Sequence, residues 1–199
     1  SKAHAVELLR EGLPATSTSA GRKPPKVNSR ALLPAPFEPG TSDADLLDQV
    51  VAFYHRTLRE APQPAAYLER RKLADSEMVE VFRLGFSNRT LGYRLPDKQR
   101  AAGKVLRTQL QELGVWSAKG HEAYDGSLVV PVLDGNGRIG QLYGRKIRRD
   151  LRKGTRLHTW LATPERPLFN PAALDAGDEV ILAGSVIDAL TLWCATFRH

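Results

Sequence analysis

The spacing of apolar residues predicts helices in the first half of the chain. Between Asp43 and Leu58 the apolar residues recur at every third or fourth position, which is the period of an amphipathic helix, and they are Leu46, Leu47, Val50, Val51, Tyr54 and Leu58. Three more helices are expected over residues 64–71, 76–82 and 97–113. Gly114 follows the last of them, and glycine is the usual residue just past a helix C-terminus.

From Ser127 onward the pattern becomes that of strands. Residues 127–133 form a nearly continuous apolar run, and Asp134 to Gly137 has the composition of a hairpin turn. Residues 138–147 are expected to form the return strand, and residues 156–161 a third strand. A core β-sheet therefore follows the helices.

The C-terminal part combines both patterns. Residues 179–183 are a short apolar run that predicts a strand, small residues follow as a turn, and residues 186–195 are expected to form a helix that carries Asp188. The fold class is predicted to be α+β: an N-terminal helical subdomain, then a mixed β-sheet core, which leads into the first strand and helix of an α/β fold.

Composition divides the chain into five predicted parts. Residues 1–13 are expected to end a preceding domain, and residues 14–42, rich in Pro, Ser, Thr, Ala and Gly, to form a flexible basic linker. Residues 43–126 form the helical subdomain, residues 127–178 the basic hairpin and sheet subdomain, and residues 179–199 the start of the α/β unit.

The overall charge favours an anionic partner. The 199 residues carry a formal charge of +7 and the pI is about 9.8, which is most simply explained by nucleic acid; the alternative is a basic surface that only keeps the protein in solution. The single cysteine, Cys194, lies among apolar residues and is expected to be a buried small hydrophobe. No apolar run approaches the roughly 18 residues of a membrane span, so we expect a cytoplasmic protein without a membrane partner.

A dense basic stretch is the main candidate for nucleic-acid contact. Eight basic residues lie between positions 138 and 156, and the candidates for binding are Arg138, Arg145, Lys146, Arg148 and Arg149. Side chains at alternate positions of a strand share one face, where they can follow the phosphates of a single strand. The alternative is a solvated loop.

Two further groups of residues have open interpretations. A second basic surface could flank the same groove or be a solvated helix face, and it comprises Arg89, Arg94, Lys98, Arg100, Lys104 and Arg107. Tyr143 and Trp160 could stack on bases, although core packing is the expected role of Trp160. His121 and His158 are expected to be surface or structural residues.

Five blocks, in this order, resemble DnaG-type bacterial and phage primases. They are Phe82 to Phe86, Leu128 to Gly140, Tyr143 to Arg145, Leu161 to Glu165 and Gly184 to Asp188. The last block resembles the entrance of the TOPRIM fold, the metal-dependent catalytic module of these primases. The family's zinc-binding domain and the rest of TOPRIM have no counterpart in the chain. The sequence also departs from the family at Ser127, Thr159, Trp160 and Ala162, where an arginine, a lysine, a tyrosine and an asparagine are usual.

The resemblance implies a segment of a DNA primase, the DNA-directed RNA polymerase that makes RNA primers on single-stranded DNA for replication. Its implied partners are the template, nucleoside triphosphates and a replicative helicase. Its implied cofactors are Mg²⁺ or Mn²⁺, with zinc in the upstream domain. The nucleotidyltransferase activity itself is in question, because Gly184 stands where the family has a glutamate, four residues before Asp188.

Asp188 is the one candidate metal ligand left, and it could instead be an acid favoured by the helix dipole. We therefore expect the segment to be inactive alone. The alternative is a non-catalytic nucleic-acid-binding relative, or an interaction subunit of a phage or mobile-element complex.

Overall fold

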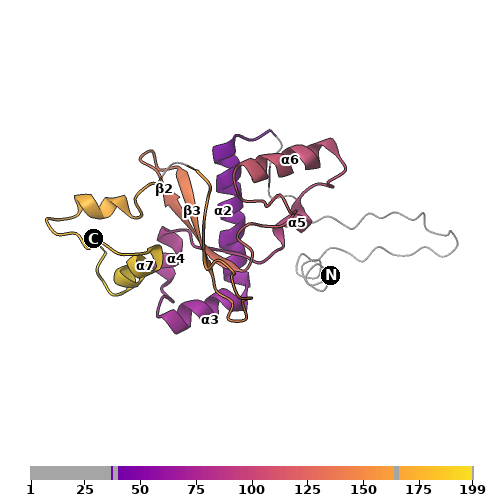
Figure 1. Cartoon of the computed structure of the whole chain (residues 1–199). Helices are drawn as coiled ribbons and strands as arrows, with labels where there is room; N and C mark the ends of the chain where they lie inside the picture. The colour runs from indigo at the N-terminus through magenta and orange to yellow at the C-terminus, as the bar shows by residue number, and fades with distance from the viewer. Residues whose placement is uncertain (1–36, 38–39, 164–165, 199) are drawn as a thin grey trace, which may run out of the picture.

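Four strands form one antiparallel sheet with helices packed on both sides (Figure 1). The computed structural model describes Phe37, residues 40–163 and residues 166–198. In chain order the elements are α2 (Asp43–Glu60), α3 (Pro62–Arg71), α4 (Ser76–Val81), β1 (Gly85–Ser87), α5 (Leu91–Arg94), α6 (Ala101–Glu112), β2 (Ser127–Leu133), β3 (Ile139–Lys146), β4 (His158–Trp160), the 3₁₀ helix η1 (Pro171–Asp175) and α7 (Val186–Cys194). The predicted α+β class is confirmed.

The strands lie in the order β1-β2-β3-β4, so β1 and β4 are the edges. Leu128 of β2 pairs with Arg145 of β3, and Tyr143 of β3 pairs with Trp160 of β4. Every pairing among the described residues is antiparallel, so the expected mixed sheet is not found there. The turn between β2 and β3 is closed by the Asp134 carboxylate, which accepts hydrogen bonds from two backbone N–H groups of the turn.

Helix α2 is the long amphipathic helix that the sequence predicts, and it runs past the sheet in Figure 1. Ser42 caps its N-terminus, with the side-chain oxygen accepting from the backbone N–H of Asp45 at 3.2 Å. The helix packs against β1 so closely that a Cβ atom on Gly85 would lie 2.7 Å from the Cβ of Tyr54. Only glycine permits this approach, so Gly85 sets the position of α2 on the sheet.

Apolar residues form two clusters, which we call the α2–α6 cluster and the α4–α7 cluster. The α2–α6 cluster joins α2, α5 and α6 to one face of the sheet, and its members include Leu46, Val50, Tyr54, Leu91, Leu110, Tyr124, Val129 and Leu142. The α4–α7 cluster joins the end of α2 and helices α3, α4 and α7 to the other face, and its members include Leu58, Tyr67, Met78, Leu128, Val130, Tyr143, Leu190 and Trp193. The sheet therefore separates two cores.

Helix α6 ends as the sequence predicts. Gly114 has φ +76°, and the backbone N–H groups of Gly114 and Val115 donate to the carbonyls of Gln111 and Leu110, both at 2.9 Å. This is the Schellman arrangement, which satisfies two of the carbonyl groups that a helix end leaves free. Within the described residues no helix combines the length and hydropathy needed to cross a bilayer.

The strand expected over residues 179–183 is wrong. These residues form no strand, and Val180, Ile181 and Leu182 are exposed, Leu182 by 88%. A strand is stable only when its backbone groups pair with a neighbouring strand. No strand in the described part of the chain lies beside this segment, so its apolar pattern is not enough to make it extended.

Only part of the predicted N-terminal region falls within the described residues. Residues 1–13 and most of the linker over 14–42 lie outside the described residues. At the linker's end Phe37 is buried in the α2–α6 cluster, and the side-chain amide of Gln109 donates to the Thr41 carbonyl at 3.1 Å. The boundary between the predicted helical and sheet subdomains stays a prediction, although β1 from the first already pairs with β2 from the second.

Candidate nucleic-acid interface

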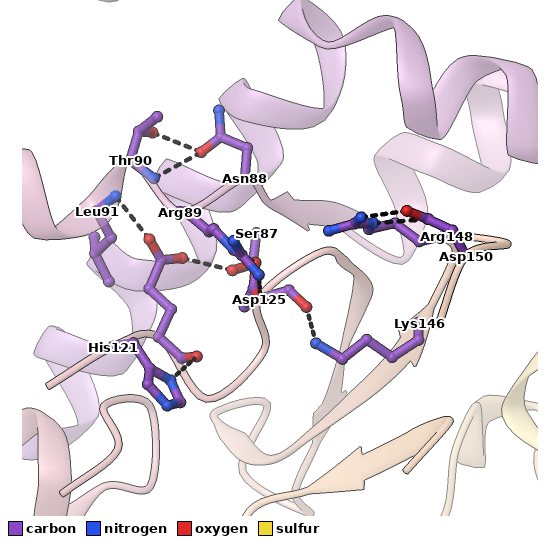
Figure 2. A network of polar contacts seen from close by, with 11 residues as sticks. Ser87, Asn88, Arg89, Thr90, Leu91, His121, Asp125, Lys146, Arg148 and Asp150 are labelled. Atoms are coloured by element: carbon purple, nitrogen blue, oxygen red, sulfur yellow. Dashed lines mark hydrogen bonds and ion pairs between the residues drawn. The ribbon is translucent and has the colours of Figure 1, made fainter. Parts of the chain in front are cut away.

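Asp125 joins three segments that are far apart in the sequence. The Nε and Nη2 atoms of Arg89, which follows β1, donate to the two carboxylate oxygens of Asp125. The Nζ atom of Lys146, at the end of β3, donates to the Asp125 backbone carbonyl, as Figure 2 shows. Burial lowers the pKa of the Lys146 ammonium group, and Asp125 opposes that shift. Asp125 thus holds two cationic side chains at one end of the sheet.

Two adjoining cavities surround this contact, and we call them together the basic groove. The larger, of about 960 Å³, is lined at Lys119, Lys146, Arg148, Arg152 and Arg156. The smaller, of about 650 Å³, adds Lys98 and Arg107, and both cavities share Arg89 and Asp125. Eight cationic side chains therefore line the groove, against three carboxyl groups, those of Glu122, Asp125 and Asp150.

The cations in the larger cavity differ in how far their charge is already balanced. Arg148 pairs with Asp150, with Nη2 at 2.6 Å from Oδ2. Arg152 and Arg156 are exposed, and no carboxylate among the described residues pairs with either of them. These two guanidinium groups are the ones most available to an anionic ligand.

The structure separates the five predicted binding residues. Lys146 and Arg148 line the basic groove, whereas Arg149 is exposed outside it. Arg138 lies at the hairpin turn, at the opposite end of β3 from Lys146, about 25 Å away at the rise of an extended strand. Arg145 precedes Lys146 on β3, and consecutive strand residues project to opposite faces, so Arg145 belongs to the other face of the sheet.

Arg145 has surroundings unlike those of the groove. It pairs with Leu128 and His158 across the sheet, and its Nη1 atom is buried without a hydrogen-bond partner among the described residues. The nearby Tyr143 is buried, which raises the pKa of its hydroxyl to about 12 although the Arg145 charge lowers it. A base cannot stack on Tyr143 in this position.

The second predicted basic surface is partly brought into the groove. Arg89, Lys98 and Arg107 line it, although Arg107 also donates to the Pro96 and Gly103 carbonyls, at 2.6 and 3.0 Å. Arg94 is not part of a basic surface. It is buried, with its guanidinium group 5.4 Å from the centre of the Phe53 ring.

Glu122 is a buried carboxyl group that the sequence gives no signal for. Its Oε2 accepts from the Ser87 hydroxyl and its Oε1 from the backbone N–H of Leu91, at 2.9 Å. Burial raises its pKa to about 7, while these two hydrogen bonds act in the opposite direction. Glu122 therefore connects the end of β1 with the start of α5 beside the groove.

Asp188 does not by itself fit a divalent metal ion. It is exposed at the start of α7, where the Ser185 hydroxyl donates to its Oδ2 at 2.7 Å and its own N–H donates back to Ser185 Oγ at 3.2 Å. This reciprocal pair is a capping arrangement. Mg²⁺ requires several oxygen ligands, and nowhere in the described residues do three His, Cys, Asp or Glu side chains gather to hold a metal.

Gly184 leaves room for the missing carboxylate. A Cβ atom at this position would have one neighbour within 4 Å, the Oδ2 of Asp188 at 3.9 Å. A glutamate at 184 would therefore start beside the Asp188 carboxylate, as a paired metal site would require.

Of the comparisons with known proteins, only the one with solved structures finds a match, and it identifies the fold. No protein-family model and no curated protein sequence matches the chain. Solved structures do: a DnaG primase catalytic domain bound to ssDNA (TM-score 0.62, 20% identity, covering 79% of this chain and 53% of that one), the E. coli primase catalytic core (0.60, 20%, 79% and 53%), and the zinc-binding and RNA polymerase domains of the Aquifex aeolicus primase (0.59, 18%, 80% and 42%).

The chain spans about half the length of these solved primases. At sequence identities of 18–20% the similarity shows a shared fold and does not show that individual residues are equivalent. The antiparallel sheet, with α2 on β1 and the helices on both faces, is therefore the fold of the DnaG primase catalytic core.

Proposed function

We propose that this chain binds the single-stranded DNA template of a DnaG-type primase, and that the basic groove is its binding surface. The observation that carries the proposal is the gathering of eight cationic side chains from separate segments into one groove. A primase catalytic domain of similar fold has been solved bound to ssDNA, which supports the same class of ligand here.

The charge distribution suits a flexible polyanion. Arg152 and Arg156 are exposed and unpaired within the described residues, so phosphates can approach them without breaking an existing ion pair. Asp125 holds Lys146 and Arg89 in place, so these two cations have fixed positions in the basic groove. Each phosphate neutralised by such a cation releases counterions, so affinity falls as salt rises.

In a complete primase we propose that this segment positions the template, while phosphoryl transfer depends on carboxylates besides Asp188. Transfer of a nucleotide from its triphosphate needs divalent cations at the reacting phosphates. Asp188 is a single exposed carboxylate engaged with Ser185, so Mg²⁺ or Mn²⁺ would need further ligands. The segment then contributes binding and orientation rather than the chemical step.

A second candidate is a nucleic-acid-binding relative without catalysis. Gly184 favours it, because the glutamate that would accompany Asp188 is replaced by a residue with no side chain. Both candidates use the basic groove, and they differ in whether a metal site can be completed.

The groove can be tested by fluorescence anisotropy with a labelled single-stranded oligonucleotide at several salt concentrations. The variant Arg152→Ala/Arg156→Ala removes two groove cations, and Arg138→Ala/Arg149→Ala is the matched control, because both pairs are exposed arginines and the second lies outside the groove. Each phosphate contact on a single strand contributes a slope of roughly −0.7 in log affinity against log salt. We expect the groove variant to flatten the slope by about 1.4 and the control to leave it nearly unchanged.

Equal effects from the two double variants would show that the charge of the surface matters and the groove does not. Parental affinity in the groove variant would place the nucleic-acid site elsewhere.

A further inference from the structure

The smaller cavity of the basic groove is lined by aromatic side chains as well as by cations. Tyr93 comes from α5, and Trp116 and His121 come from the loop between α6 and β2. Tyr93 is only partly buried, and in the described part of the chain it is a member of neither apolar cluster. Its ring is therefore part of the groove wall rather than of the core.

The two cavities of the basic groove differ in charge. Six cationic side chains and two carboxyl groups line the larger cavity, whereas three cationic side chains and two carboxyl groups line the smaller one. Of these three cations, Arg89 is paired with Asp125, and Arg107 donates to two backbone carbonyls. The larger cavity therefore suits phosphates, and the nearly balanced, aromatic smaller cavity suits an uncharged planar group.

The two cavities adjoin at Arg89, His121 and Asp125, which line both of them. In Figure 2, Arg89 and Asp125 lie between His121 on one side and Arg148, of the larger cavity, on the other. A strand whose phosphates follow the larger cavity can therefore continue past Arg89 and place one of its bases in the smaller cavity.

Short contacts fix the walls of the smaller cavity. A Cβ atom on Gly92 would lie 2.9 Å from Cη2 of the Trp116 ring, so glycine lets the backbone of α5 come this close to the indole. The Ser117 N–H donates to the His121 carbonyl at 2.8 Å, which closes the loop that carries both aromatic residues. A planar group that enters the cavity thus meets preformed surfaces, so its binding requires little ordering of the protein.

We propose that the smaller cavity is a subsite for one nucleobase of the single strand whose phosphates occupy the larger cavity, and that the base stacks on the Tyr93 ring. The inference rests on the proposed function and adds a base contact to it. Every base has a π-face, so such a contact tolerates any sequence. Loss of one stacked base weakens binding by about 5- to 150-fold. Because Tyr93 makes no phosphate ion pair, its loss leaves the salt dependence of binding unchanged.

The first test compares Tyr93→Leu, which keeps apolar bulk but removes the ring, with Tyr93→Phe, which keeps the ring. Each variant is titrated with oligo(dT) and with an oligonucleotide of equal length made of abasic sites. We expect Tyr93→Leu to weaken oligo(dT) binding at least 5-fold and to leave abasic binding unchanged, whereas Tyr93→Phe should bind both ligands as the parent does. The control Phe197→Ala removes an aromatic ring that is 56% exposed and lines neither cavity of the groove, and it should bind as the parent does.

The second test uses tryptophan emission and leaves Tyr93 intact. Among the described residues that line the groove, Trp116 is the only tryptophan. Oligo(dT) should quench the emission of the parent and of Trp160→Phe in parallel with binding, and the abasic oligonucleotide should not. Trp116→Phe should abolish the quenching.

The outcomes separate this inference from the function on which it rests. If the parent binds neither oligonucleotide, the proposed function fails. If the parent binds oligo(dT) but Tyr93→Leu binds it equally well, or loses affinity for the abasic ligand by the same factor, the groove remains and the base subsite is overturned. Quenching that persists in Trp116→Phe would also overturn the subsite, because the bases would then lie elsewhere.

Discussion

Replacing Glu122 by glutamine should make the stability of the protein less dependent on pH. Glu122 is 2% exposed, and its burial raises its pKa to about 7 despite the hydrogen bonds from Ser87 and Leu91. Glutamine has the same shape. Its carbonyl can accept from the Leu91 N–H, and its amide can donate to the Ser87 hydroxyl, which serves equally as acceptor.

The direction and size of the effect follow from the two pKa values of Glu122. The unfolded chain loses the proton near the ordinary value of 4.5, whereas the folded protein keeps it until about pH 7. Between these values the folded state binds more protons than the unfolded state, so the free energy of unfolding falls as pH rises and stays lowered above pH 7. At about 1.4 kcal/mol per pKa unit the total cost is about 3 kcal/mol.

Urea unfolding of the parent and Glu122→Gln between pH 4 and 8.5 measures the effect. The quantity to follow is the difference in the free energy of unfolding between the two proteins, because the five histidines and the other carboxyls contribute equally to both and cancel. We expect the difference to be small near pH 4, to move in favour of Glu122→Gln through pH 4.5 to 7, and to level off about 3 kcal/mol from its starting value. Glu112→Gln, at an exposed position at the end of α6, is the control and should show no such movement.

Two results would refute the reasoning about Glu122. A difference independent of pH would mean that the folded protein does not hold this carboxyl protonated. Movement in the opposite direction, with the parent gaining stability as pH rises, would mean that the donors Ser87 and Leu91 outweigh burial.

Two other substitutions test packing and the missing carboxylate. Gly144→Ala would place a Cβ atom 2.4 Å from Cδ1 of the buried Tyr124 ring, so we expect the free energy of unfolding in urea to fall by about 1–3 kcal/mol. The control Gly135→Ala, whose Cβ atom meets open space, should lower it much less. Equal losses of stability in the two variants would contradict the clash. Gly184→Glu adds a carboxylate beside Asp188. A second negative charge about 4 Å from a divalent ion is worth roughly 2 kcal/mol in water, so Mn²⁺ should bind about thirtyfold tighter in a calorimetric titration. Unchanged Mn²⁺ affinity would show that residues 184 and 188 do not face one metal.

Local patterns predicted those parts of the fold that depend on neighbouring residues. The apolar stripe of α2, the β2–β3 hairpin and the cap at Gly114 each require only a few adjacent residues, and each is found. Residues 179–183 have the composition of a strand, but pairing depends on a neighbouring strand that composition does not supply.

The candidate site was predicted less well, because its contacts join distant segments. The charge of the groove was visible in the sequence, but the role of Asp125 was not, since Arg89 and Lys146 reach it from 36 and 21 positions away. The separation of Arg145 from Lys146 follows from the alternation of side chains along a strand and was open to prediction. The exposure of Trp160, which is 44% exposed on the edge strand β4 although core packing was its expected role, was not, because burial of an edge strand depends on what packs beside it.

The place of α2 between the two cores makes the described chain one cooperative unit. Leu46, Val50 and Tyr54 belong to the α2–α6 cluster, and Leu58, one turn further along the same helix, belongs to the α4–α7 cluster. If the packing of either cluster were lost, α2 would lose part of the contacts that hold it in place, and the other cluster, which packs against the same helix, would be destabilised as well. The two faces of the sheet are therefore linked as a single foldon, and strain applied on one side is transmitted to the other along α2.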